Sequence, residues 1–249
     1  MKFLILTRKH LVMAGCLLLA AIIGTAISVS AFAKQERLLP IYCVKTEEKK
    51  IALTFDAAWG ADDTDTLIEI LKRYNAPATF FVVGEWVDKY PEEVKRLSEA
   101  GNDVMNHSAN HPYMTSLSEA QMKEQLTSCN SKIEAVTGKK PTLFRCPYGD
   151  YDNKVVSTVE SIGMKTLQWD VDSLDWQESA TVESIVSRVT GKVKNGSIVL
   201  FHNDADHTPE ALPIILEKLT ADGYTFVKAA DLIYWDNYTI DNTDMQVKK

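Results

Sequence analysis

Residues 50–56 have the sequence KIALTFD, an apolar run that ends in a carboxylate. A short run of apolar, β-branched and aromatic residues predicts a buried strand, here at 50–55. Six similar runs follow along the chain, at 78–83, 103–106, 142–144, 165–171, 197–202 and 224–227. Segments with helical periodicity lie between the runs, at about 63–74, 91–100, 118–137, 152–162, 181–192 and 209–222.

Strands that alternate with helices predict an α/β fold, with a mostly parallel sheet wrapped by helices. The sheet is expected to form either a barrel or an open doubly wound arrangement. Ser118 and Gln121 predict a capping box at the start of one helix, and Gly138 ends it. Thr208 and Pro209 predict that the last helix starts with a threonine cap followed by proline.

The composition and the missing motifs argue against two classes of function. The chain has 249 residues, of which 45% are apolar and 24% are charged, and its formal net charge is −7. An acidic chain without a basic stripe is not expected to bind nucleic acid. No G-x-G-x-x-G follows the first strand and no phosphate-binding G-x-x-x-x-G-K-[ST] occurs, so the nucleotide-binding folds lose support.

The N-terminus has the pattern of an export signal. Four residues, Lys2, Arg8, Lys9 and His10, precede an uncharged stretch at 11–33 that ends in Ala-Phe-Ala. We expect 1–33 to be a signal peptide or a membrane-anchor helix, which places the rest of the chain outside the cytoplasm, secreted or attached through 11–33. The expected divisions after it are a linker at 34–49, a main domain at 50–235 and a polar C-terminal tail at 236–249.

Unusual polar residues follow the ends of the predicted strands. The carboxyl ends of parallel strands meet on one face of an α/β fold, which is where ligands bind. These polar residues are Asp56, His107, Arg145, Asp172, Asp175 and His202. Because separate segments deliver them to one rim, the sequence predicts a functional site there.

Residues 107–112 read His-Ser-Ala-Asn-His-Pro. Pro112 disfavours helical geometry at His111, so the two histidines are expected on a loop after a strand. Both imidazoles can still turn toward one divalent cation. The alternative is that they are two unrelated loop histidines.

Together these motifs resemble the polysaccharide deacetylases of the NodB homology type, carbohydrate esterase family four, from about residue 50 to 228. The matching segments are T-F-D at 54–56, A-T-F-F at 78–81, H-S-x-x-H-P at 107–112, R-x-P-Y-G at 145–149, D-W at 175–176 and L-x-H at 200–202. The resemblance implies a distorted (β/α) barrel with about seven parallel strands, preceded here by the signal or anchor helix. It also implies that 50–235 is the catalytic domain.

The resemblance implies catalytic roles for four residues. Asp56 would be the general base and His202 the general acid. Asp175 would hold His202, and Arg145 would position Asp56. These roles suit amide hydrolysis, because a base must take a proton from water and an acid must protonate the departing nitrogen.

Five further residues have implied roles in binding. His107 and His111 would bind a divalent metal, with zinc or cobalt expected. The backbone N–H of Tyr148 would contact the oxyanion, and Trp176 and Leu200 would line the substrate pocket.

One position departs from the family pattern. The first motif is usually T-F-D-D-G, in which the second Asp is the third metal ligand, but here Ala57 stands in its place. The alternatives are that metal binds weakly with extra waters, that Asp56 turns to ligate it, or that the protein works without metal. Asp62 or Asp63 could also supply the missing ligand.

The resulting hypothesis is an exported hydrolase that removes N-acetyl groups from a cell-wall glycan, with peptidoglycan as the expected acetylated substrate. The alternative is a non-catalytic protein on the same fold that binds glycan or organises wall assembly, because the usual third ligand is Ala57. The form T-F-D-x-x-W-G resembles a subgroup associated with sporulation.

Overall fold

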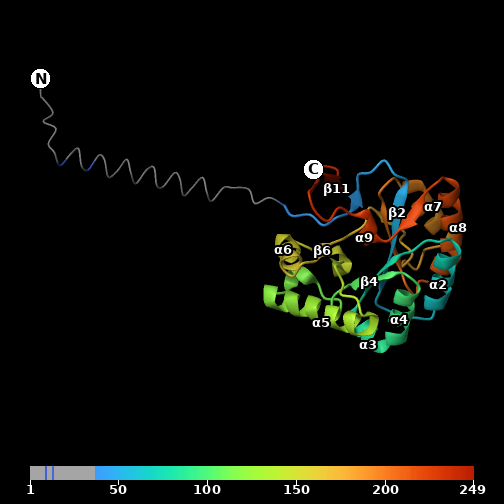
Figure 1. Cartoon of the computed structure of the whole chain (residues 1–249), viewed down its shortest axis with the longest axis horizontal. Coiled ribbons are helices and arrows are strands. Elements are labelled where there is room, and N and C mark those ends of the chain that lie inside the picture. The colour runs from blue at the N-terminus through green and yellow to red at the C-terminus, as the bar shows by residue number, and fades with distance from the viewer. Residues whose placement is uncertain (1–8, 10–12, 14–36) are drawn as a thin grey trace, which may run out of the picture. The chain divides into compact units, whose positions relative to one another are not determined.

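The computed structural model describes Lys9, Met13 and residues 37–249. The expected signal or anchor segment at 1–33 therefore lies outside the described residues, except at two positions. Within the described part, no helix has both the length and the apolar character needed to cross a membrane. Residues Leu38–Lys249 form one compact unit (Figure 1).

A parallel sheet runs through this unit and confirms the expected distorted barrel. Along its path lie β6 (Lys165–Thr166), β5 (Leu143–Phe144), β4 (Asp103–Asn106), β3 (Thr79–Val82), β2 (Lys50–Ala57), β8 (Ile198–His202) and β7 (Val171–Asp172), while β9 (Thr225–Val227) pairs with β2 off this path. Every pairing among them is parallel. The path ends at β6 and β7, so the barrel is open at that seam.

The predicted strand at 165–171 is wrong in one respect, because it is two short strands. Leu167 forms a bridge with Ile41, and the Asp170 carboxylate accepts the backbone N–H of Ile198 at 2.8 Å. These contacts with other segments interrupt the expected strand and separate β6 from β7. Trp169, in the turn between the two strands, is thereby free to line the cavity described below.

The alternation along β2 separates two environments. Ile51, Leu53 and Phe55 are fully buried in the apolar layer between the sheet and the helices. Side chains of a strand alternate between faces, so Thr54 and Asp56 lie on the opposite, interior side. The strand therefore places a carboxylate at the carboxyl end of the barrel interior.

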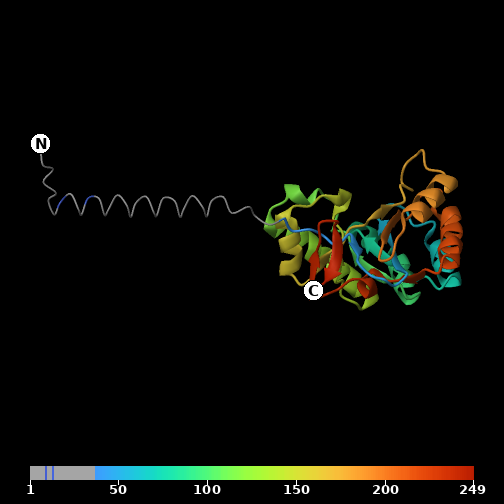
Figure 2. The ribbon, with the colours of Figure 1, turned by 90° about the horizontal axis from the view of Figure 1, so that it is seen from above.

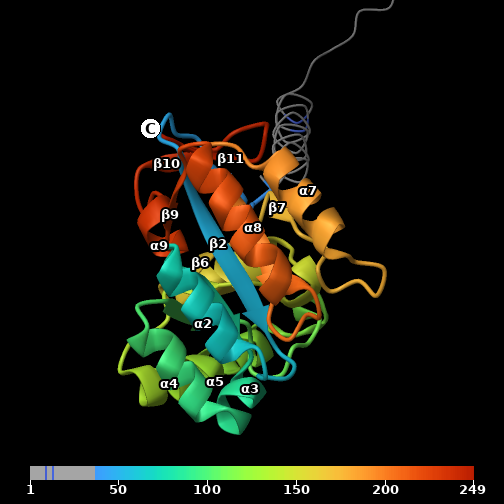
Figure 3. The ribbon, with the colours of Figure 1, turned by 90° about the vertical axis from the view of Figure 1, so that its right-hand side faces the viewer.

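Helices cover the outside of the sheet, and Figure 3 shows α8 along β2, with α2 and α7 as its neighbours. Their bounds are α2 (Thr64–Arg73), α3 (Gly84–Lys89), α4 (Pro91–Glu99), α5 (Glu119–Thr137), α6 (Asn153–Ser161), α7 (Val182–Lys192), α8 (Thr208–Ala221) and α9 (Ala229–Leu232). The periodicity missed α3 and α9, which are only 6 and 4 residues long. The capping box of Ser118 and Gln121 is present, and Gly138 ends α5 in a left-handed conformation.

The expected threonine cap of the last helix is wrong. His207 occupies the N-cap position of α8, and Thr208 is the first helical residue. The Thr208 hydroxyl donates instead to the buried carboxylate of Asp175 at 2.7 Å. A residue that looked like a local helix signal thus takes part in a long-range contact.

The segments expected to be a linker and a tail join in a second sheet. Strand β1 (Cys43–Val44) pairs in parallel with β11 (Met245–Lys248), and β11 pairs antiparallel with β10 (Tyr238–Ile240). Figure 2 shows the C-terminus beside the red strands of this sheet. Ile41 also pairs with the segment at the end of β6, since its N–H donates to the Thr166 carbonyl and its carbonyl accepts the N–H of Gln168. Both segments are therefore parts of the folded unit.

Gly196 provides a test of this packing. Its φ is +80°, and a Cβ atom there would overlap the carbonyl of Val44 in β1. We expect Gly196→Ala to lower the free energy of unfolding by at least about 2 kcal/mol, measured by urea denaturation. Gly191→Ala in α7 is the matched control, because a Cβ there meets nothing within 4 Å and helical Gly→Ala is neutral or stabilising. Equal stabilities of the two variants would contradict the assigned packing.

Candidate active site

A cavity of about 410 Å³ lies at the carboxyl ends of the strands. Most of the predicted site residues line it, namely Asp56, His107, His111, Tyr148, Trp176, Leu200 and His202. Asp172, which also follows a strand, lines it as well. Arg145 and Asp175 are not among the lining residues, but each bonds to one that is. The strands therefore bring the predicted set together.

A buried ion pair fixes Asp56. The Arg145 side chain is 0% exposed, and its Nη1 donates to Asp56 Oδ1 at 2.7 Å. Its Nη2 donates to Thr54 Oγ1 at 2.8 Å and to the Gln168 carbonyl at 3.1 Å. The ring of Phe81 lies 4.2 Å from the guanidinium. Burial is the largest single influence and raises the pKa of Asp56, but the charge and hydrogen bond of Arg145, together with His107 and His202, hold that pKa below its usual value, so the group is a carboxylate at neutral pH.

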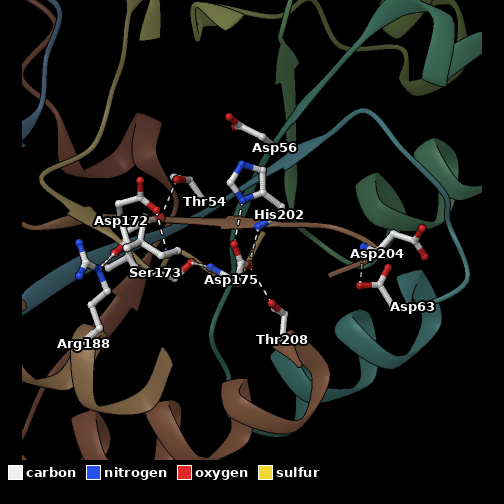
Figure 4. A network of polar contacts seen from close by, with 12 residues as sticks. Thr54, Asp56, Asp63, Asp172, Ser173, Asp175, Arg188, His202, Asp204 and Thr208 are labelled. Carbon is white, nitrogen blue, oxygen red and sulfur yellow. Dashed lines mark hydrogen bonds and ion pairs between the residues drawn. The ribbon is translucent and has the colours of Figure 1, made fainter. Parts of the chain in front are cut away.

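A second carboxylate holds His202. Asp175 Oδ1 lies 2.8 Å from His202 Nδ1, and its Oδ2 accepts the backbone N–H of His202 at 2.8 Å. Burial lowers the pKa of His202, but the bond to Asp175 and its negative charge raise the pKa above the usual value. Figure 4 shows the His202 ring between Asp175 and Asp56. These contacts with Asp175 favour the protonated form of the His202 imidazole.

His107 and His111 come together as the loop motif suggested. Their Nε2 atoms are 3.2 Å apart, and His107 Nε2 lies 3.5 Å from Asp56 Oδ2. A carbonyl oxygen can only accept, so His107 Nδ1 carries the hydrogen that is donated to the Arg145 carbonyl at 2.9 Å. Burial lowers the pKa of both imidazoles, that of His111 to about 4. Both rings are therefore neutral at pH 7, and His107 presents a free Nε2 lone pair.

The loop that carries these histidines is held in a strained shape. Ser108 and His111 have φ values of +74° and +61°, a conformation that costs about 1–3 kcal/mol for a residue other than glycine. Asn106 Oδ1 accepts the backbone N–H of Ser108 at 2.7 Å, and Ser108 Oγ accepts that of His111 at 3.0 Å. Asn106 Nδ2 in turn donates to Asn130 and Leu126 of α5. The helix thus preorganises the histidine pair.

The two imidazoles fit a shared divalent cation. Metal–nitrogen bonds of about 2.0–2.1 Å at a tetrahedral angle place two ligand atoms roughly 3.3 Å apart, close to the spacing found. A third protein ligand is not in place, because Ala57 is 0% exposed within the apolar layer. Across the described residues, no group of three or more His, Cys, Asp or Glu side chains could hold a metal ion.

The two alternative ligands proposed from the sequence do not join the histidine pair. Asp63 Oδ2 instead accepts the backbone N–H of Asp204 at 2.9 Å (Figure 4). Asp62 is an exposed residue of the turn before α2. Neither residue lines the cavity.

Aromatic side chains border the cavity on two sides. Tyr148 has a φ of +58°, and its ring lies 4.3 Å from Tyr113 in a stacked pair and 4.5 Å from His111. On the other side, Trp59 lies 5.3 Å from the His202 ring, and Trp176 is 54% exposed.

Sequence reasoning missed the contributions of Thr208, Trp169 and Tyr113. None of the three follows a predicted strand. Their roles arise from contacts between distant segments, which a local pattern does not contain.

Comparisons with known proteins agree with this geometry. A family model described as polysaccharide deacetylase matches residues 44–167. The chain is 31% identical over 202 residues to the Bacillus subtilis peptidoglycan-N-acetylmuramic acid deacetylase PdaA, covering 80% of this chain and 77% of that protein. It is 35% identical over 195 residues to a Bacillus cereus peptidoglycan-N-acetylglucosamine deacetylase, covering 76% of this chain and 91% of that protein. It spans only 60% and 40% of two further Bacillus subtilis relatives, YlxY and PdaC.

A solved structure adds an informative relative. The crystal structure of a CE4 family pseudoenzyme from Bacillus anthracis matches with a TM-score of 0.75 and 35% identity, covering 80% of this chain and 69% of that one. A mutant of the same protein, described as having restored enzymatic activity, matches equally well at 36% identity. The fold and the site define a member of the CE4 deacetylases. The chain belongs to the polysaccharide deacetylase family.

Metal binding tests the hypothesis that His107 and His111 share one divalent cation. We expect the wild-type chain to bind Zn²⁺ or Co²⁺, and His111→Ala to weaken that binding at least about tenfold, because one of two imidazole ligands is removed. Calorimetric titration with each metal and elemental analysis of the purified protein measure this. His207→Ala is the control, since His207 does not line this cavity. Equal metal content in His111→Ala and wild type would contradict a shared cation.

Proposed function

We propose that this protein removes N-acetyl groups from a cell-wall glycan, with peptidoglycan as the substrate. The observation that carries the proposal is the pairing of Asp56, held ionised by Arg145, with His202, held protonated by Asp175, on one cavity. Amide hydrolysis needs a base and an acid at the same time, and this pair supplies one group suited to each role. The names of the Bacillus relatives support the substrate class.

The proposed roles follow from the positions of the groups. Asp56 takes a proton from the attacking water, and His202 gives a proton to the departing nitrogen. The backbone N–H of Tyr148 stabilises the oxyanion, a contribution of roughly 3–4 kcal/mol for one well-placed donor. Trp176 and Leu200 line the side of the cavity that receives the acetyl group.

A divalent cation would fit beside the proposed base and acid. His107 and His111 would hold it, and zinc or cobalt suits imidazole ligands. When bound, such an ion polarises the amide carbonyl and makes the water more acidic. The residues of the chain remain responsible for moving both protons.

The alternative function is a non-catalytic protein that binds glycan or organises wall assembly on the same fold. Two observations favour it: Ala57 replaces the usual ligand, and a family member of similar structure is described as a pseudoenzyme. Against it, a protein that only binds glycan has no need for an ionised base and a protonated acid on one cavity. Polar groups buried in this way are costly unless they are used.

The proposal extends to location. A glycan of the wall lies outside the cytoplasm, which agrees with the signal or anchor proposed at 1–33 and with attachment through 11–33. The link to sporulation and the domain limits at 34–49, 50–235 and 236–249 stay predictions.

Acetate release from purified peptidoglycan tests the activity. We expect Asp56→Asn and His202→Gln each to lower the rate about 10²–10⁴-fold, since each removes one proton-transfer group. Asp88→Asn on α3 is the matched control and should keep the wild-type rate, because Asp88 pairs with Lys132 and neither residue lines the cavity. Circular dichroism shows whether each variant remains folded. Wild-type protein that releases no acetate, with or without Zn²⁺ or Co²⁺, would favour the binding alternative.

The pH dependence tests the role of Asp175 separately. His202 acts as an acid only while it is protonated, so activity should fall as the pH rises through its raised pKa. Asp175→Asn removes the negative charge that raises this pKa, so the alkaline limb of kcat/KM should move to lower pH. The acid limb depends on Asp56 and should stay in place. An alkaline limb that does not move in Asp175→Asn would contradict the assignment of His202 as the acid.

A further inference from the structure

Trp59 is a half-exposed aromatic residue that the proposed roles do not use. It is 52% exposed, and it belongs to none of the apolar clusters formed by the described residues. Packing of the core therefore does not account for its position. The indole instead lines the catalytic cavity, where its ring centroid lies 5.3 Å from that of the His202 imidazole and the two ring planes are tilted by 50°.

The backbone beside Trp59 is bonded to the residue that follows His202. The carbonyl of Gly60 accepts two hydrogen bonds, one from the indole N–H of Trp86 at 2.9 Å and one from the side-chain amide of Asn203. Both donors are buried. A carbonyl oxygen has two lone pairs, so both are used here. These bonds fix the segment that carries Trp59 against the strand end that carries His202.

Two further contacts keep the same segments together. The backbone N–H of Asn203 donates to the carbonyl of Asp56 at 3.1 Å. A Cβ atom at Gly60 would overlap the carboxylate of Asp204, so the chain at Gly60 lies directly on the residues that follow His202. Backbone contacts therefore hold this loop in place, although its indole ring is half in water.

The His202 ring is held by a carboxylate and contacted by an indole. Asp175 Oδ1 lies 2.8 Å from Nδ1, which leaves Nε2 as the nitrogen that can transfer a proton. The Trp59 indole lies within the distance of about 6 Å at which a cation is attracted to an aromatic ring. This attraction acts on an imidazolium and is lost when the imidazole becomes neutral. The contact with Trp59 therefore favours the charged ring in its observed position.

We propose that Trp59 is a positioning residue for the general acid, and that its indole holds the His202 imidazolium ready for proton transfer through a cation–π contact. This inference rests on the proposed function, since it needs His202 to act as the acid. Trp59 acts through His202 and transfers no proton itself. A competing role for Trp59, stacking on a sugar ring of the substrate, predicts a different change in the kinetics.

The other groups around the His202 ring stay the same when Trp59 is replaced by an apolar residue. The titratable ones are Asp56 of β2, Asp172 of β7, Asp175 of the loop after β7, and His107 and His111 of the loop after β4. Burial lowers the pKa of His202, and the three carboxylates raise it. Phe and Leu at position 59 both cover the imidazole with carbon, but only Phe has an aromatic face. A comparison of the two variants therefore isolates the cation–π contact.

An NMR titration tests the contact without any turnover. The probe is the Cε1–H signal of His202 in the full chain labelled with ¹³C-histidine, assigned by its loss in His202→Gln. We expect Trp59→Phe to titrate as wild type does, and Trp59→Leu to titrate about 0.5 pH unit lower, in keeping with a partly exposed cation–π contact. Equal midpoints in the two variants, or a higher midpoint in Trp59→Leu, would overturn the proposal.

The kinetics of acetate release show whether the contact serves the reaction. We expect Trp59→Leu to lower kcat about fivefold with KM unchanged, and to move the alkaline limb of kcat/KM to lower pH. Trp59→Phe should keep most of the wild-type kcat. A rise in KM with an unchanged kcat would assign Trp59 to sugar binding and overturn the proposal. An unchanged kcat and KM in Trp59→Leu would overturn it as well.

The two measurements separate this inference from the proposed function. Wild-type protein that releases no acetate, together with the expected NMR difference, would refute the deacetylase and retain the contact that holds the imidazolium. Acetate release with equal NMR midpoints and equal kcat values in Trp59→Phe and Trp59→Leu would retain the deacetylase and refute the role of Trp59. Both variants should fold, which circular dichroism checks, because Trp59 is half exposed and lies outside the apolar clusters of the described residues.

Discussion

The ion pair between Arg145 and Asp56 is the contact on which the rest of the site depends. Both side chains are removed from water, and a buried charge is tolerated only when it is paired and hydrogen-bonded. Arg145 is held by three different segments, since its side chain bonds to Asp56 and Thr54 of β2 and to Gln168, and its backbone carbonyl accepts from His107. The guanidinium of Arg145 therefore fixes Asp56 and the end of β2, and its backbone carbonyl fixes the tautomer of His107.

A second constraint acts on the opposite side of the cavity. Asp175 uses both oxygens, one on the His202 ring and one shared between the His202 backbone and Thr208. Because Thr208 begins α8, the helix and His202 are held to the same carboxylate. The two halves of the site thus have the same design, in which an oppositely charged buried partner sets the protonation state of the group that faces the cavity.

Much of this could be predicted from the sequence because it is encoded locally. An apolar run followed by Asp56, or a His-x-x-x-His spacing before Pro112, indicates both the strand and the functional residue that follows it. The contact beside the opening of the barrel could not be predicted in this way. Ile41 and Leu167 are 126 positions apart, and neither segment carries a signal that it pairs with the other. The polar residues after 236 read as a tail for the same reason, since β11 acquires its pairing only from β1. Thr208 and Trp169 were missed because each contributes through contacts with residues that are distant in the sequence and become neighbours only in the folded chain.

The pairing of β1 with β11 has a consequence for the order in which the protein can fold. Met245 and its partner Cys43 are 202 positions apart, and every strand of the parallel sheet lies between them in the sequence. A ribosome delivers the chain from its N-terminus onward, so β1 and β11 can pair only after all strands of the parallel sheet have been made. The small second sheet is therefore completed on a sheet whose strands already exist and can pair with one another.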